Sequence, residues 1–128
     1  TSVIDIDFSS LDQTLIKQKI VLGDFDPNDY ITERTWAKGH DGVKIPVSLV
    51  YRKSTFKKEG KQPLLLYAYG SYGATIDPYF SSARLSLLDR GFVFAIAHIR
   101  GGEYLGTNWY ESGKLLLKKN TFEDCRTI

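Results

Sequence analysis

The stretch that decides the fold is FVFAIAHIRGG, residues 92–102, where an almost unbroken apolar run ends in an arginine and two glycines. A short apolar run without alternation is typical of a strand that is buried on both faces of a sheet. A pair of glycines directly after it permits positive φ angles or a close approach of two backbones. The run therefore predicts a central strand over residues 92–99.

The segments on either side place this strand in an α/β arrangement. A second apolar run, LLLYAY, covers residues 64–69, and SARLSLLDR at 82–90 has the apolar spacing of a short helix that Gly91 ends. Strand, helix and strand in this order predict a βαβ unit with parallel strands. ITERTWA at 31–37 and VKIPVSLVY at 43–51 flank an Asp-Gly turn and predict an antiparallel hairpin, in which Pro46 favours an edge position for the second strand.

The two ends of the chain differ from this middle part. Val3 to Phe8 and Leu15 to Leu22 predict a separate antiparallel pair, and GDFDPNDY at 23–30 is a turn-rich loop that marks a boundary. Residues 110–119 are compatible with a helix. A further helix is expected from NTFEDCRTI at 120–128, with Asn120 or Thr121 as its cap.

Composition limits the function classes. The chain has 128 residues, 42% apolar, with a formal net charge of +2, which suits one globular domain and gives no reason to expect nucleic acid as a partner. The single cysteine, Cys125, excludes an internal disulfide and suits a reducing compartment. We find no membrane span, signal peptide, metal motif or cofactor motif, and expect a cytoplasmic protein without a cofactor.

The segment LLLYAYGSYGA, residues 64–74, places Tyr69 and Tyr72 where a buried strand gives way to a loop. A buried tyrosine hydroxyl needs a hydrogen-bond partner, which is either a backbone carbonyl in the core or a substrate oxygen. In α/β-hydrolases a loop after the third strand supplies an oxyanion donor, and the nucleophile follows on a later strand-to-helix elbow. The position of Tyr69 matches that loop.

The stretch YAYGSYGATIDPYFSSARLSLLDRGFVFAIAHIRGGEYLGTNWYESGKLLLKKNTFED, residues 67–124, resembles the start of the catalytic domain of the prolyl oligopeptidase family of serine peptidases. The motifs SLVYRKS, SARLSLLDRGFV, WYESGK and KKNTFED are more similar to oligopeptidase B than to prolyl oligopeptidase itself. The resemblance implies that residues 30–128 are the N-terminal part of an α/β-hydrolase peptidase domain. Residues 1–29 are then the end of a β-propeller and a linker.

The resemblance also implies roles for the two tyrosines. The family motif Tyr-Gly-Tyr-Gly-Gly-Phe corresponds to residues 67–72, which makes Tyr69 the oxyanion donor and Tyr72 a wall of the pocket for the substrate side chain. Ala68 and Ser71 replace glycines of that motif. The implied activity is hydrolysis of short peptides after arginine or lysine through an acyl-enzyme.

The nucleophilic part of such a site is not in this sequence. Gly70-Ser71-Tyr72-Gly73 lacks the spacing of a Gly-x-Ser-x-Gly elbow, and in the family the catalytic Ser, Asp and His follow the helix expected near Thr121. We therefore expect a chain that ends before the elbow and is inactive alone. Two alternatives stay open: a non-catalytic piece with a structural or interaction role, and a parent with acylaminoacyl-peptidase or esterase activity.

The remaining polar residues carry structural expectations. His98 near the end of a buried strand and His40 in a turn are not assigned as catalytic bases, and no acid/base pair is assigned to the carboxylates. Arg100 is expected to have a structural role, with Glu103 as an available partner, and Cys125 to pack in the core. Because no further parallel strand follows residues 92–99, we expect an apolar edge there, through which the chain self-associates.

Overall fold

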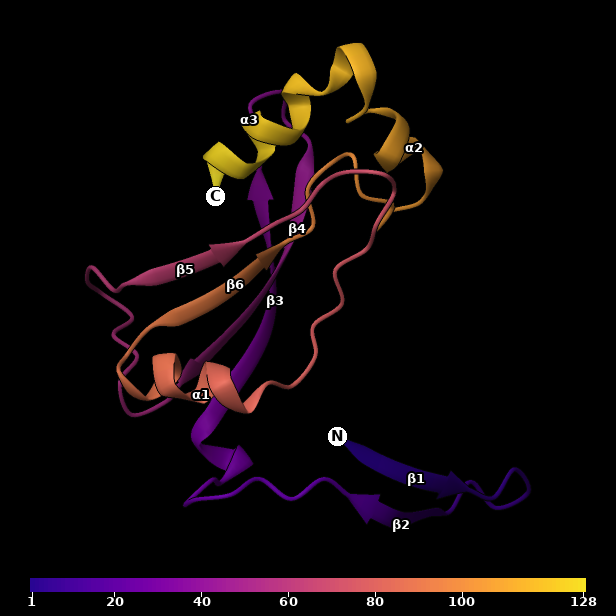
Figure 1. The fold of residues 1–128 in the computed structure, drawn as a ribbon, viewed down its shortest axis with the longest axis vertical. Helices are drawn as coiled ribbons and strands as arrows, with labels where there is room; N and C mark the ends of the chain where they lie inside the picture. The colour runs from indigo at the N-terminus through magenta and orange to yellow at the C-terminus, as the bar shows by residue number, and fades with distance from the viewer.

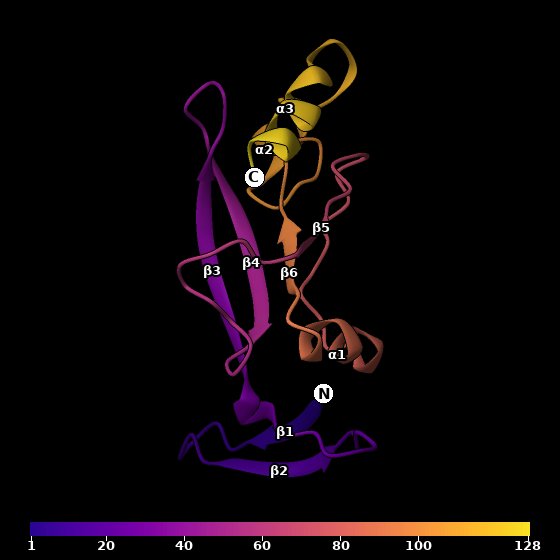
Figure 2. The ribbon, with the colours of Figure 1, turned by 90° about the vertical axis from the view of Figure 1, so that its left-hand side faces the viewer.

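The structure, a computed structural model, describes residues 1–128 and contains two separate sheets. A two-stranded sheet pairs β1 with β2, and a four-stranded sheet has the order β3-β4-β6-β5. The elements are β1 (Ser2–Ile6), β2 (Gln13–Gln18), the 3₁₀ turn η1 (Pro27–Asp29), β3 (Tyr30–Lys38), β4 (Lys44–Arg52), β5 (Leu64–Tyr67), α1 (Ser82–Asp89), β6 (Val93–Ala97), α2 (Thr107–Glu111), η2 (Leu115–Leu117) and α3 (Lys119–Thr127). Figures 1 and 2 show the β1–β2 hairpin lying apart from the larger sheet.

The predicted central strand is confirmed. Every residue of β6 is buried, and β6 pairs with β4 antiparallel and with β5 parallel. Helix α1 connects the parallel strands β5 and β6, so the predicted βαβ unit is present. The β3–β4 hairpin also forms as predicted, because Gly42 takes a φ of 83° in the Asp41-Gly42 turn. Together these elements form a mixed α/β layer consistent with part of a hydrolase domain.

The predicted open edge was assigned to the wrong strand. The prediction placed the open edge at β6, but β4 pairs with the side of β6 that β5 leaves free. The open edge next to β6 belongs to β5, whose residues Leu64, Leu65 and Tyr67 are 46%, 42% and 47% exposed. The physical reason is that the preceding hairpin, and not a later strand, supplies the second neighbour of β6.

This edge leads to a first testable prediction. Residues 1–128 produced alone are expected to elute from a size-exclusion column at more than the monomer mass, because an apolar edge strand pairs with a second copy. Leu65→Lys should shift elution toward the monomer, since lysine on an edge opposes strand pairing. Thr35→Lys is the control, because it adds the same charge on β3, at the other end of the sheet, and should leave the elution unchanged. Elution of the unmodified chain at its 14.5 kDa monomer mass would exclude edge pairing.

The predicted edge position of Pro46 is also wrong, because β4 lies between β3 and β6. Pro46 is tolerated because it stands just beyond the β4–β6 ladder, where its carbonyl accepts from the His98 N–H at 3.0 Å. A proline cannot return the second hydrogen bond of that pair. The His98 carbonyl instead accepts from the indole N–H of Trp109 at 2.9 Å. An interior strand thus accommodates proline when a side chain supplies the missing donor.

Apolar residues pack on both faces of the sheet. One cluster joins Leu88, Phe94 and Ile96 under α1, and the other joins Ile45, Ala97 and Ile99. Cys125 from α3 packs against the second cluster, which confirms its expected packing role. Figure 1 shows α2 and α3 beyond the C-terminal end of β6, whereas α1 lies at its start. Loops that carry sites in α/β folds gather at this C-terminal end.

The helical predictions for the last part of the chain are partly wrong. Residues 110–119 do not form one helix, because α2 ends at Glu111 and a 3₁₀ turn follows at Leu115–Leu117. Helix α3 begins at Lys119, and neither Asn120 nor Thr121 caps it. Their side chains bond other segments instead: the Asn120 amide donates to the Ser112 carbonyl at 3.0 Å. The predicted capping hydrogen bonds are therefore absent, and the helix begins after Lys118 without a side-chain cap.

The N-terminal hairpin confirms the predicted antiparallel pairing of β1 and β2. All of its strand residues are exposed, including Val3, Ile4, Leu15 and Ile16. Its assignment to the end of a β-propeller stays a prediction, as do the domain boundaries near residue 30. No helix of the chain is both long enough and apolar enough to span a bilayer.

Candidate functional site

The loop that follows β5 carries both predicted site residues. Tyr69 is 48% exposed and lines a small cavity with His98 and Tyr104. Tyr72 is 88% exposed and has a φ of 55°. Neither tyrosine is a buried core residue, because β5 ends at Tyr67 and both lie on the loop that follows. Two phenol rings instead face outward at the C-terminal end of the parallel strands.

The backbone of this loop is held in a defined conformation. Gly70 has a φ of 65°, and a Cβ there would lie 2.5 Å from Cγ2 of Thr121 and 2.8 Å from Cδ1 of Ile99. The Gly73 N–H donates to the carbonyl of Gly101 at 3.0 Å. Left-handed φ values at non-glycine residues such as Tyr72 cost free energy, and persist where the surroundings impose them. Close packing at Gly70 and the Gly73–Gly101 hydrogen bond thus restrain the backbone that follows Tyr69.

The two departures from the family motif have structural partners. Ala68 packs against the cluster of Ile45, Ala97 and Ile99. The Ser71 hydroxyl lies 2.7 Å from Nζ of Lys118, which also donates to the carbonyl of Gly70. Burial lowers the pKa of Lys118. The methyl group of Ala68 and the hydroxyl group of Ser71 therefore each make a contact within the chain.

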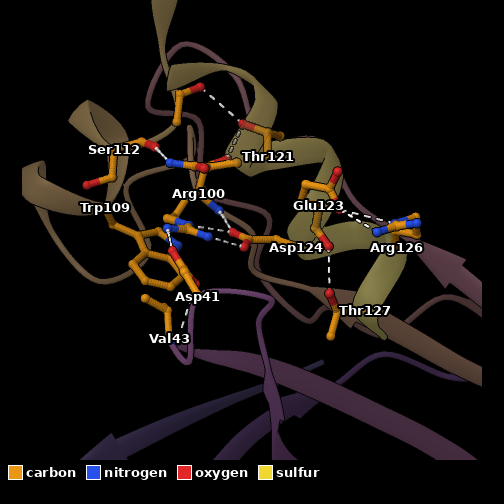
Figure 3. A network of polar contacts seen from close by, with 12 residues as sticks. Asp41, Val43, Arg100, Trp109, Ser112, Thr121, Glu123, Asp124, Arg126 and Thr127 are labelled. Carbon is orange, nitrogen blue, oxygen red and sulfur yellow. Dashed lines mark hydrogen bonds and ion pairs between the residues drawn. The ribbon is translucent and has the colours of Figure 1, made fainter. Parts of the chain in front are cut away.

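Arg100 is the centre of a buried ion-pair network, shown in Figure 3. Its Nε and Nη2 donate to the two carboxylate oxygens of Asp124 at 2.9 and 2.5 Å, and its Nη1 donates to Asp41 at 2.6 Å. The side chains of Arg100 and Asp124 are 5% and 0% exposed. Bidentate pairing with Asp124, supported by Asp41, raises the pKa of Arg100, while Arg100 lowers the pKa of Asp41.

This network ties the β3–β4 turn to α3 across the end of β6. Glu103, which the sequence offered as an available partner of Arg100, instead accepts from the Thr107 hydroxyl at 2.9 Å. The Thr121 hydroxyl lies 2.8 and 3.0 Å from the carbonyls of Arg100 and Gly113, so one donor is placed between two acceptors. Arg100 is thus committed to contacts within the chain. Its expected structural role agrees with this burial and pairing.

A buried serine and histidine lie close to the tyrosine loop. Ser48 Oγ is 2.8 Å from Nε2 of His98, and the His98 ring stacks on Tyr104 at 3.8 Å between centroids. Burial, with a smaller contribution from Arg34, lowers the pKa of His98 to about 4. Sequence reasoning did not single out Ser48, because no local pattern connects it with a histidine 50 positions away. It also did not single out Tyr104, whose stacking on His98 no motif indicates.

The Ser48–His98 pair does not have the arrangement of a catalytic pair. A nucleophilic serine site needs a third group that orients the histidine, and His98 here contacts an aromatic ring and a hydroxyl. Its pKa of about 4 keeps the imidazole neutral at pH 7. His98 therefore acts as a neutral packing and hydrogen-bonding group. His40 is exposed in the β3–β4 turn.

A second testable prediction concerns pH. The unfolded chain protonates His98 below about pH 6.5, whereas the folded chain protonates it only near a pKa of about 4. The stabilisation from neutral His98 is therefore complete above about pH 6.5 and is lost as pH falls toward about 4. Between about pH 7.5 and 5 we expect a loss of about 2 kcal/mol in the free energy of unfolding.

The measurement is urea unfolding at both pH values for the wild type, His98→Gln and His40→Gln. His98→Gln should remove most of this pH dependence, because glutamine does not titrate. His40→Gln changes an exposed histidine and should keep the pH dependence of the free energy of unfolding. Equal pH dependence in all three proteins would contradict the assignment to His98.

Comparisons with known proteins agree with the arrangement of these elements. Residues 78–128 match the prolyl oligopeptidase family. The chain is 57% identical over 110 residues to dipeptidyl aminopeptidase BI of Pseudoxanthomonas mexicana, and 46% identical over 104 residues to Protease 2 of Moraxella lacunata. These matches cover 85% and 81% of this chain and 15% of each relative. The chain thus spans about one seventh of the length of these curated relatives.

A solved structure gives the same relation in three dimensions. Oligopeptidase B from Leishmania major superposes with a TM-score of 0.87 at 46% sequence identity, covering 98% of this chain and 18% of that protein. The fold of this chain is therefore shared with part of a peptidase of known structure. On sequence and structure together, the chain belongs to the prolyl oligopeptidase family of serine peptidases.

Proposed function

We propose that the protein hydrolyses short peptides through an acyl-enzyme and that the Tyr69 hydroxyl donates a hydrogen bond to the oxyanion. One observation carries the proposal: a half-exposed phenol at the C-terminal end of β5, on a loop whose backbone is held by Gly70, Gly101 and Lys118. An oxyanion donor acts best when it is fixed before the charge develops. The hydrogen bonds of Lys118 go to Gly70 and Ser71 on this loop, which leaves the Tyr69 hydroxyl available for a substrate oxygen.

Tyr72 is the proposed wall of the pocket for the substrate side chain that precedes the scissile bond. It lies on the same loop, three residues beyond Tyr69, and its ring is 88% exposed. An exposed aromatic ring beside an oxyanion donor offers apolar contact to a bound peptide. The short sequence distance between the two residues links recognition of the side chain to positioning of the carbonyl.

For specificity we propose cleavage after arginine or lysine. The support is the similarity to Protease 2 of Moraxella lacunata and to oligopeptidase B from Leishmania major, each at 46% identity. The motifs SLVYRKS, WYESGK and KKNTFED of this chain resemble that kind of peptidase. A second candidate comes from the relative named dipeptidyl aminopeptidase BI, at 57% identity. That name describes removal of dipeptides from a free N-terminus. The two candidates differ in whether the substrate must have a free amino group.

The test is hydrolysis of fluorogenic peptides by the full-length protein that carries this chain. Substrates with arginine, lysine, proline or alanine before the reporter group are compared, each with a free and a blocked N-terminus. Turnover of blocked arginine and lysine peptides supports the oligopeptidase proposal. Turnover restricted to unblocked dipeptides would favour the dipeptidyl aminopeptidase, and turnover after proline alone would overturn the basic specificity.

Three further points belong to this proposal. Residues 1–128 should be inactive alone, because they contain no Gly-x-Ser-x-Gly elbow. The hairpin of residues 2–18 is proposed as the end of a β-propeller that limits access by size. A cytoplasmic location is proposed because the single cysteine is free and packs on the core, as suits a reducing compartment.

A further inference from the structure

Lys118 contacts the Tyr69 loop from a distant part of the sequence. It lies between η2 and α3, and its Nζ reaches across 47 and 48 residues of sequence to the Ser71 hydroxyl, at 2.7 Å, and the Gly70 carbonyl. Its neighbour Lys119 is exposed. Two adjacent lysines thus have different surroundings, and one of them is directed at the peptide that follows Tyr69.

The acceptors of Lys118 are unusual for a lysine. A partly buried ammonium is normally paired with a carboxylate, because burial disfavours its charge. Lys118 instead donates to a carbonyl and a hydroxyl, its Nζ lies 5.8 Å from the Phe122 ring centre, and burial lowers its pKa. For stability alone such an arrangement has little advantage over a well-packed apolar side chain. What this arrangement does specifically is to fix the position of the Gly70 carbonyl.

The Gly70 carbonyl determines the orientation of the peptide directly after Tyr69. On one side this oxygen lies against Gly101, where a Cβ would collide with it. On the other side it accepts from Lys118. Tyr72, two residues on, has a left-handed φ of 55°, a conformation that relaxes when its restraints are removed. Without the ammonium, the oxygen keeps its steric restraint at Gly101 and loses the attractive one.

We propose that Lys118 is a positioning residue that orients the Tyr69 hydroxyl by holding the Gly70 carbonyl. This inference rests on the proposed oxyanion role of Tyr69. Small displacements of a transition-state donor reduce turnover strongly, by about 100-fold for a shift near 1 Å. Loss of the ammonium should therefore lower kcat by about 10- to 100-fold. KM should change little, because an oxyanion contact is made mainly in the transition state.

The test uses the full-length protein and the peptide substrate that it cleaves best. Lys118→Met removes the ammonium and keeps an unbranched apolar side chain, and Lys118→Gln replaces it with a neutral amide in case the methionine variant does not fold. Lys119→Met is the matched control, an identical substitution one residue away at an exposed site. Lys118→Arg retains a charged donor and should restore most of kcat.

A double-mutant cycle with Tyr69→Phe separates positioning from a merely structural role. If Lys118 acts through Tyr69, Lys118→Met should lower kcat by less than about threefold once the Tyr69 hydroxyl is gone. The proposal is overturned if Lys118→Met and Lys118→Gln keep kcat within about threefold of Lys119→Met, or if their losses multiply with that of Tyr69→Phe.

The same set of variants distinguishes failure of this inference from failure of the proposed function. A large effect of Tyr69→Phe with no coupled effect of Lys118 keeps the oxyanion role and removes the positioning role. An unchanged kcat in Tyr69→Phe removes both, because Lys118 then has no donor to position.

Discussion

Replacing Tyr69 with phenylalanine in the full-length protein is expected to lower kcat by about 10- to 1000-fold, with a smaller change in KM. The substitution removes one oxygen and keeps the ring, so packing in the small cavity beside His98 and Tyr104 is retained. An oxyanion donor stabilises charge that exists only in the transition state. Steady-state kinetics on a fluorogenic peptide measures the effect directly.

Tyr67→Phe is the matched control for this prediction. Tyr67 is 47% exposed and Tyr69 is 48% exposed, and both lie on the same short segment. Tyr67 belongs to β5 itself, so its side chain projects from the strand and not from the loop. We expect Tyr67→Phe to leave kcat within about twofold of the wild type, as expected of a residue that makes no transition-state contact. Equal kinetics for both variants would remove Tyr69 from the mechanism.

The second large effect is on stability. Arg100→Met should lower the free energy of unfolding by about 3–5 kcal/mol, because removing one partner of a buried ion pair leaves an uncompensated charge. The charge left behind is that of Asp124, whose side chain is 0% exposed. Methionine fills much of the volume of the arginine stem, so the loss is chiefly electrostatic. Urea unfolding of the full-length protein, followed by a probe in this domain, gives the value.

An exposed ion pair on α3, the helix that also carries Asp124, provides the control. Arg126 pairs with Glu123 at 2.9 Å, and the Arg126 side chain is 80% exposed. Arg126→Met should therefore cost less than about 1 kcal/mol. The comparison tests burial as the source of the effect, since each substitution replaces the arginine of an ion pair by methionine. A loss of similar size for Arg126→Met and Arg100→Met would contradict the assigned role of burial.

Local patterns in the sequence predict much of the sheet. The apolar run at residues 92–99 identifies β6, and the Asp41-Gly42 turn identifies the β3–β4 hairpin. The helical spacing at residues 82–90 identifies α1 within one residue of its observed end. Each of these features depends on side chains that are close in sequence, where periodicity and turn chemistry act.

Features that depend on distant pairing were missed or wrong. The strand order β3-β4-β6-β5 moved the open edge from β6 to β5, and the indole of Trp109 made Pro46 acceptable inside the sheet. Arg100 pairs with Asp124 and Asp41, at separations of 24 and 59 residues, and not with the nearby Glu103. No local pattern encodes such partners, because several carboxylates lie within reach along the chain.

For the candidate site as well, the sequence predicted some features and missed others. The family motif places Tyr69 and Tyr72 on one loop at the end of a strand, as the structure has them. Their exposure was not predicted, because the end of β5 at Tyr67 depends on pairing with β6. Lys118 was also missed. Its contact with Gly70 joins residues 48 positions apart, which no local pattern encodes.

The measurement that tests the central claim most directly is labelling with a fluorophosphonate probe, which reacts with activated serines. The source lysate is labelled, and a gel is read against an antibody raised to residues 1–128. We predict a labelled band several times larger than 14.5 kDa that the antibody recognises, as expected for an active serine peptidase that includes this chain. An antibody-reactive band near 14.5 kDa without label would contradict the account and favour a non-enzymatic role.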